Sequence, residues 1–240
     1  MRTGIRKSVW AAVAALVLIV AGAWFYVNDY YHAEESALAA LAPVEGVSVI
    51  QESDRVVFQP EMPKAGLIFY PGGKVEFTAY APLMQTLAKE GVLCVLLKMP
   101  ANLAVLDMDA AEGIPEQFPE TGSWYLAGHS LGGSMAASYI AGAEGYDGLI
   151  LLAAYSTEDL TEQPVKVLSL YGSEDGVLDL EKYRSYRPNL PEDTREMVIP
   201  GGNHAQFGSY GPQEGDGTAA ISPEEQRNVT AEEILGFLGE

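Results

Sequence analysis

Ser130 is the residue of this sequence whose surroundings best fit a chemical role. It lies in the pentapeptide GHSLG at 128–132, which matches the G-x-S-x-G pattern of an activated serine. An apolar run at 124–128 precedes the serine, and apolar residues at helical spacing follow it over 131–139. A sharp turn from strand to helix exposes a serine hydroxyl and requires small residues on both sides. We therefore interpret Ser130 as a nucleophile, and a glycine-rich turn with a capping serine is the alternative.

A serine nucleophile needs a general base, and the chain contains three histidines. His32 lies in an N-terminal segment rich in alanine and glutamate. His129 adjoins Ser130 within the turn, and we expect its side chain to point away from the reacting face of the serine. His204 follows the last predicted strand, in the glycine-rich loop IPGGNHAQFG. By elimination His204 is the predicted base, and an exposed loop histidine is its alternative role.

The base in turn needs a carboxylate that orients it. The segment SLYGSEDGVLDL places Glu174 and Asp175 just after a predicted strand. We predict that Asp175 is this acid and that Glu174 is a surface charge. Asp159, which follows the preceding strand, is the alternative acid.

Acyl transfer also needs backbone N–H groups that stabilise the oxyanion of the tetrahedral intermediate. The segment YPGGKV ends the first predicted parallel strand, and it can present the N–H groups of Gly73 and Lys74. Leu131, which directly follows the predicted nucleophile, would supply another. A simple Pro-Gly turn is the alternative interpretation of YPGGKV.

Alternating strands and helices are predicted to position these residues. Six apolar runs predict strands at 65–70, 92–97, 124–128, 148–154, 165–171 and 195–200, after a hairpin formed by VSVIQ and RVVFQ. Helices are expected around 80–87, over part of 102–113, after 131, and from Ser222 or Thr230, each of which opens a capping box. Strands that are apolar on both faces predict a mainly parallel α/β sheet with helices on both sides. Ligands bind such sheets at the carboxyl ends of the strands, where the residues above are placed.

The first thirty residues have the composition of a membrane anchor. Residues 8–27 contain no charge. A helix of this length can cross about 30 Å of hydrocarbon. Arg2, Arg6 and Lys7 precede this run and favour a cytoplasmic N-terminus with the remaining chain outside. A signal peptide cleaved near Ala23 is the alternative. The expected organisation is an anchor at 1–28, a helical stalk at 29–45 and an α/β domain at 46–240.

The composition narrows the partners and cofactors. The net charge of −19 argues against a nucleic-acid partner, because phosphates require a cationic surface. Cys94 is the sole cysteine and lies in an apolar run, which indicates a buried hydrophobic role. Neither a CxxC motif nor a His-rich metal spacing occurs, so we expect no metal site. Acyl transfer by a serine, a histidine and a carboxylate needs no metal or organic cofactor, so none is expected.

Several motifs together resemble the α/β-hydrolase fold superfamily. They are GHSLGG, the order Ser130, Asp175 and His204, and the segments FYPGGKVEFTAYAPL, MPANLAVL, YGSEDGV and GGNHAQFGSYGPQEGDG. Over about residues 45–240 the sequence is similar to small, lidless, dienelactone-hydrolase-like bacterial proteins that are anchored in a membrane. True dienelactone hydrolases use a cysteine nucleophile, so the serine here favours ester substrates. Pro71 also replaces the histidine that usually precedes Gly72.

The resemblance implies a serine hydrolase that acts on a small-molecule, lipid or cell-wall acyl substrate. Two other functions remain open: an inactive binding module on a hydrolase scaffold, and an acyltransferase that uses the same triad. Only a short segment, Tyr155 to Pro164, occupies the place where many relatives insert a cap, which predicts an open site. Tyr155 and Asn102 are candidate substrate contacts.

Overall fold

The computed structural model describes residues 2–239, without the side chains of residues 2–9, 11 and 12. The chain divides into two compact units, Met1–Tyr30 and Tyr31–Glu240. Each unit is described by itself below.

The first unit is one helix, α1 (Arg2–Asn28). Its last turn continues into a hydrogen bond from the Asp29 N–H to the Phe25 carbonyl at 3.0 Å. Within the described part of the chain, no helix combines the length and apolar character needed to cross a membrane. The basic side chains predicted to flank the anchor, at Arg2, Arg6 and Lys7, lie outside the described residues.

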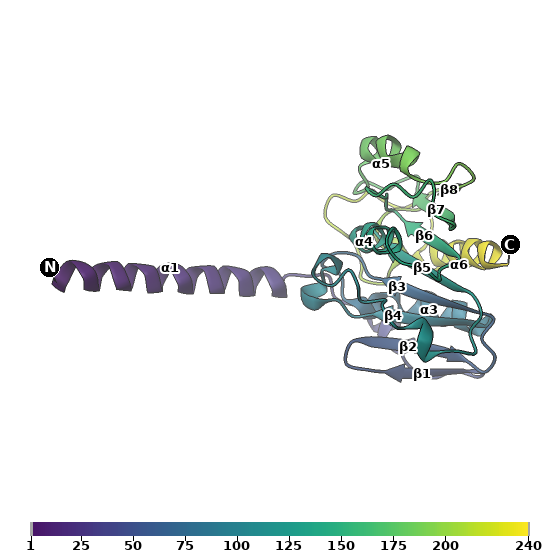
Figure 1. Ribbon diagram of the computed structural model, residues 1–240, viewed down its shortest axis with the longest axis horizontal. Coiled ribbons are helices and arrows are strands. Elements are labelled where there is room, and N and C mark those ends of the chain that lie inside the picture. The colour runs from purple at the N-terminus through teal and green to yellow at the C-terminus, as the bar shows by residue number, and fades with distance from the viewer. Residues whose placement is uncertain (1, 240) are drawn as a thin grey trace. The chain divides into compact units, whose positions relative to one another are not determined.

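The second unit is built on one eight-stranded sheet with the strand order β1-β2-β4-β3-β5-β6-β7-β8 (Figure 1). β1 and β2 pair antiparallel, β2 pairs antiparallel with β4, and the remaining neighbours are parallel. The strands are β1 (Val47–Gln51), β2 (Arg55–Pro60), β3 (Ala65–Tyr70), β4 (Val92–Leu97), β5 (Trp124–His129), β6 (Gly148–Leu152), β7 (Lys166–Gly172) and β8 (Arg195–Ile199). The predicted hairpin, the six later strands and the mainly parallel sheet are therefore confirmed.

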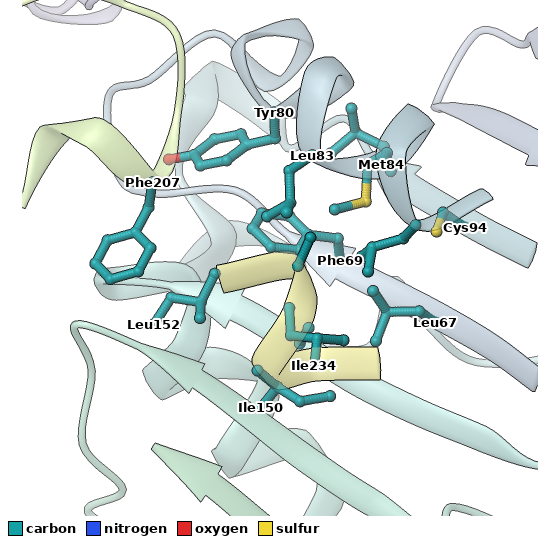
Figure 2. Packing of buried hydrophobic residues seen from close by; sticks show 14 of the residues in the cluster. Leu67, Phe69, Tyr80, Leu83, Met84, Cys94, Ile150, Leu152, Phe207 and Ile234 are labelled. Carbon is teal, nitrogen blue, oxygen red and sulfur yellow. The ribbon is translucent and has the colours of Figure 1, made fainter. Parts of the chain in front are cut away.

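Helices cover both faces of the sheet because the central strands are buried on both sides. β3, β4, β5 and β6 are buried at every residue. On one face, α3 (Ala81–Lys89) and α6 (Pro223–Leu238) pack on a core that includes Leu83, Met84 and Ile234 (Figure 2). On the other face, α4 (Leu131–Ile140) contributes Ala136, Ala137 and Ile140 to a second core. Cys94 is fully buried in the first core, as predicted.

Two helices, α5 (Leu180–Tyr186) and α6, begin at a side-chain cap. α6 begins at the first of the two predicted boxes, where the Ser222 hydroxyl accepts a hydrogen bond from the Glu225 N–H at 3.1 Å. A short helix that the sequence analysis did not predict, α5, is capped by Asp179. Its carboxylate accepts from the N–H groups of Glu181 and Lys182.

The predicted helix over part of 102–113 is wrong. Two short 3₁₀ turns, Pro100–Asn102 and Ala104–Leu106, begin this stretch in place of an α-helix. Ala101 and Asn102 have positive φ angles of 52° and 56°. Two successive left-handed residues cannot continue a right-handed helix, so the chain turns here.

The predicted stalk at 29–45 is also corrected, because residues from Tyr31 onward belong to the second unit. The Tyr31 N–H donates to the Lys74 carbonyl, and the Glu34 N–H donates to the Ser209 carbonyl, both at 2.8 Å. α2 (Glu35–Ala39) buries Ala37 completely. Alanine is small enough to pack closely, so an alanine-rich helix can lie against a domain as well as stand alone.

Candidate active site

Ser130 occupies a strained turn between β5 and α4. Its φ and ψ angles are 52° and −124°, a region that non-glycine residues rarely adopt. Such strain persists only where the surrounding structure enforces it, and it is concentrated at functional sites. The turn places Ser130 at the carboxyl end of a central parallel strand, where ligands of open α/β sheets bind.

Three glycines make this turn possible. A Cβ at Gly128 would lie 2.6 Å from the carbonyl carbon of Gly132. A Cβ at Gly132 would lie 2.2 Å from the Pro71 carbonyl oxygen, and one at Gly133 would lie 2.6 Å from the Ala154 Cβ. α4 therefore starts in direct backbone contact with the end of β3, which brings Ser130 close to the predicted oxyanion loop.

Asp175 and His204 form a buried pair. His204 Nδ1 lies 2.9 Å from Asp175 Oδ2, and each side chain is only 1% exposed. Asp175 Oδ1 also accepts hydrogen bonds from the N–H groups of Val177 at 2.9 Å and Leu178 at 2.7 Å. A carboxylate can only accept, so His204 donates this bond from Nδ1 and leaves Nε2 for another partner.

The two other candidate acids lie elsewhere. Asp159 is exposed, and its carboxylate accepts hydrogen bonds from the backbone N–H and hydroxyl of Thr161 at 3.0 Å and 2.6 Å. These bonds, led by the one to the Thr161 hydroxyl, lower the pKa of Asp159. Glu174 is exposed and accepts from the Ser173 hydroxyl at 2.9 Å. Asp175 is thus the candidate acid that contacts His204.

Ser130 and His204 line the same cavity, which has a volume of about 250 Å³. His204 Nε2 is buried and has no hydrogen-bond partner among the described residues. In the absence of substrate, the hydrogen bond between a nucleophile and its base is often longer than usual. The unpaired Nε2 is therefore consistent with a base that faces Ser130. The remaining lining residues are Leu131, Ser134, Ala153, Ala154, Tyr155, Val177, Leu178 and Asp179.

The predicted oxyanion loop needs one correction. The Lys74 N–H donates to the Asn102 carbonyl at 2.8 Å, so it is not available to a substrate. Lys74 also has a positive φ of 58°, a conformation that few non-glycine residues adopt. Gly73 remains next to Leu131, because a Cβ at Gly73 would lie 2.9 Å from the Leu131 Cδ2. The N–H groups of Gly73 and Leu131 have no acceptor within the described part of the chain, and they are the candidate oxyanion donors.

The His129 side chain is buried in the protein interior, next to the ring of the predicted base. Its Nδ1 forms a hydrogen bond with the Tyr80 hydroxyl at 2.8 Å, and the Tyr80 oxygen accepts a second bond from the Gly72 N–H at 3.1 Å. The His129 ring centroid is 4.5 Å from that of His204. Burial, together with the adjacent His204, lowers the pKa of His129 well below 6.5, so the ring is neutral at neutral pH. We conclude that His129 supports the site and is not directed at the reacting face of Ser130.

The structure separates the two candidate substrate contacts. Tyr155 lines the cavity and stacks on Tyr186 with ring centroids 5.3 Å apart. Asn102 is not one of the lining residues, and its carbonyl accepts a hydrogen bond from the Lys74 N–H.

Among the described residues, no group of three or more His, Cys, Asp or Glu could hold a metal ion.

Tyr80 is a supporting residue that the sequence analysis did not identify. Its hydroxyl lies at the centre of the chain of bonds that joins Gly72 to His129. In the sequence it is one apolar residue of a helical pattern, which gave no signal of a polar role. Figure 2 shows its ring in the core with the hydroxyl oxygen pointing away from Leu83 and Met84.

Comparison with known proteins identifies the fold. Residues 66–228 match the model of a family described as the alpha/beta hydrolase family. No curated protein matches the chain. The similar solved structures include TT1662 from Thermus thermophilus, with 18% identity and a TM-score of 0.59 over 81% of this chain and 99% of that chain.

Two further similar structures are those of an esterase and a dienelactone hydrolase. Esterase 2 of Thermogutta terrifontis, phosphoramylated by tabun, shares 14% identity with a TM-score of 0.57, over 82% of this chain and 97% of that chain. Dienelactone hydrolase from Anabaena variabilis shares 12% identity with a TM-score of 0.56, over 78% of this chain and 96% of that chain. At these identities the likeness shows the fold.

Proposed function

The chain belongs to the alpha/beta hydrolase family, and on that premise we propose that it is a serine hydrolase of carboxylic esters or related acyl bonds. The observation that carries the proposal is the buried 2.9 Å pair of Asp175 and His204 at the cavity that holds Ser130. The strained backbone of Ser130 supports it, because strain of this kind is maintained at reacting residues. The esterases among the similar structures support an ester substrate.

The proposed reaction has two steps. Ser130 Oγ attacks the carbonyl carbon of the substrate while His204 Nε2 takes the hydroxyl proton. Asp175 holds the imidazole by its Nδ1 and stabilises the positive charge that develops on it. The N–H groups of Gly73 and Leu131 stabilise the oxyanion, and His204 then donates the proton to the leaving alcohol. Water attacks the acyl-enzyme by the reverse path and releases the acid.

The cavity favours small acyl groups. Its volume of about 250 Å³ lies below the range of roughly 300–1,000 Å³ that is usual for ligand pockets. Its apolar walls are formed by Leu131, Ala153, Ala154 and Val177. We therefore expect short acyl chains to be hydrolysed faster than long ones.

The test is hydrolysis of p-nitrophenyl acetate, butyrate and octanoate by the wild-type chain and by Ser130→Ala. Removal of the nucleophile is expected to lower kcat by roughly 10⁴-fold or more while the fold is retained. Ser138→Ala is the matched control, because Ser138 lies on the same helix outside the cavity lining. Hydrolysis by Ser130→Ala at the wild-type rate would refute the proposed function.

The location is a second part of the proposal. We propose that the uncharged segment 8–27, in which some side chains lie outside the described residues, anchors the chain in a membrane with the hydrolase unit on the outer side. The uncharged run at 8–27 supports this, as do exposed apolar side chains such as Leu18, Ile19 and Phe25. After expression of the full chain, the protein should remain in the membrane fraction at high salt. Recovery of the intact chain in the soluble fraction would contradict anchoring, and an intact mass that begins near Trp24 would show signal-peptide cleavage instead.

A further inference from the structure

The loop that follows His204 contains a carboxylate that the proposed mechanism does not use. This carboxylate, Asp216, accepts hydrogen bonds from four backbone N–H groups. Its Oδ1 accepts from Gly176 at 3.1 Å, from His204 at 3.2 Å and from Gly217 at 2.8 Å. Its Oδ2 accepts from Ala205 at 2.9 Å. Both oxygens are therefore used in holding backbone.

Three of these four donors belong to the two turns that carry the proposed acid and base. Gly176 directly follows Asp175, and the N–H groups of His204 and Ala205 belong to the turn of the base. One side chain therefore ties the acid turn to the base turn. The 2.9 Å distance between Asp175 and His204 depends on the relative position of these two turns.

The backbone of this loop also packs directly against the acid turn. A Cβ at Gly176 would lie 2.6 Å from the Gly215 carbonyl oxygen, and a Cβ at Gly217 would lie 1.9 Å from the Glu174 carbonyl oxygen. The Asn203 side chain donates to the Gly217 carbonyl at 2.9 Å from the side of the base turn. The loop thus lies in contact with both turns, and glycines are required where it passes the acid turn.

A carboxylate suits this position better than an amide does. Hydrogen bonds to a charged acceptor are roughly twice as strong as bonds between neutral groups. An asparagine at 216 would offer one acceptor oxygen and would direct an NH₂ group at a backbone donor. Asp216 also lies outside the lining of the 250 Å³ cavity and borders a separate cavity of about 450 Å³. Its action must therefore pass through the two turns.

We propose that Asp216 is a positioning residue of the triad. Its carboxylate holds the acid turn and the base turn in register, so that Asp175 reaches Nδ1 of His204 and Nε2 is directed at Ser130. The inference rests on the proposed function. It gives a role to a residue of the GSYGPQEGDG segment, in which no residue was predicted to act in the site.

The test compares Asp216→Asn with Glu214→Gln in the full chain. Both variants replace a carboxylate by its amide in the same loop, and Glu214 is exposed. With p-nitrophenyl acetate as the probe, Asp216→Asn is expected to lower kcat by about 10²-fold, the cost of roughly 1 Å of misplacement at a catalytic group. KM is expected to stay within about threefold, because Asp216 does not line the substrate cavity. Glu214→Gln is expected to keep wild-type kcat and KM.

A merely structural role would lower the melting temperature and leave kcat of the folded enzyme unchanged. All rates are therefore measured well below the melting midpoint of each variant. Wild-type kcat in folded Asp216→Asn, or a rise in KM at constant kcat, would overturn the inference.

A conservative variant keeps the test decisive if Asp216→Asn does not fold. Asp216→Glu retains the charge and shifts the carboxylate by one methylene, so it cannot meet all four donors at once. We expect about a 10-fold loss of kcat with KM unchanged, and wild-type kcat in this variant would overturn the inference. Ser130→Ala separates the two proposals. Full activity of Ser130→Ala refutes the proposed function, whereas its inactivity together with full activity of Asp216→Asn refutes only the role of Asp216.

Discussion

Gly132→Ala is expected to destabilise the protein and to impair catalysis, because a Cβ at this position has no space. It would lie 2.2 Å from the Pro71 carbonyl oxygen and 2.3 Å from the Tyr70 carbonyl oxygen. Each distance is about 1 Å shorter than an ordinary van der Waals contact. Both neighbours are backbone atoms, so no side-chain rotation can relieve the clash.

The size of the effect follows from what would have to move. Tyr70 ends β3, which is held by β4 on one side and by β5 on the other. α4 must therefore shift away from β3. Overpacking costs roughly 1–3 kcal/mol of stability, and we expect a loss at the upper end of this range or above it. For a chain of this size about 3 kcal/mol lowers Tm by roughly 6–12 °C. The shift also moves the Leu131 N–H by about 1 Å, which is expected to lower kcat by about 10²-fold.

Thermal unfolding and ester hydrolysis measure these two effects. Gly142→Ala is the matched control, since a Cβ at Gly142 has nothing within 4 Å and the residue follows the last turn of α4. We expect this control to remain within about 1 kcal/mol of the wild type. If Gly132→Ala melted like the control and kept full kcat, the account of α4 packed on the end of β3 would be refuted.

Three further predictions concern the residues around the proposed base. Asp175→Asn is expected to lower kcat by about 10⁴-fold with the fold retained, because His204 loses the acceptor that sets its tautomer; wild-type kcat would contradict this. Tyr80→Phe leaves the Gly72 N–H and His129 Nδ1 unpaired in the interior, so we expect the free energy of unfolding to fall by about 1–3 kcal/mol. Denaturant unfolding measures this loss, and an unchanged midpoint would contradict it. Because the folded pKa of His129 lies below 6.5, the unfolded chain binds one more proton as pH falls below 6.5. The free energy of unfolding then falls by up to about 1.4 kcal/mol per pH unit, and His129→Gln should reduce this fall. Denaturant unfolding at several pH values measures it, and an equal fall in the wild type and in His129→Gln would contradict the prediction.

The parts of the fold that follow from hydrophobic patterning could be predicted from the sequence. Runs such as AGLIFY and VLCVLL are buried on both faces, and only central parallel strands fit that pattern. The stalk and the helix over 102–113 were wrong for local reasons. Composition does not reveal that Ala37 packs into the domain or that Ala101 adopts a positive φ.

The site divides in a similar way. Ser130, Asp175 and His204 each follow a strand, so chain order and the geometry of a parallel sheet were enough to bring them to one edge. The Lys74 N–H was misjudged because its acceptor, the Asn102 carbonyl, is a backbone atom in a loop. Asp216 was missed for the same reason. All four of its donors are backbone N–H groups, which leave no pattern in side-chain types, and it is one of 33 acidic residues.

Covalent labelling with a fluorophosphonate shows whether Ser130 is the nucleophile. The reagent phosphonylates a serine that is activated by a base, and peptide mass spectrometry identifies the modified residue. We predict one adduct, on Ser130, in the wild-type chain. In His204→Ala we predict that labelling is slower by about 10³-fold or more. An unlabelled wild-type chain, or an adduct on a serine other than Ser130, would contradict the assignment of Ser130 as the nucleophile.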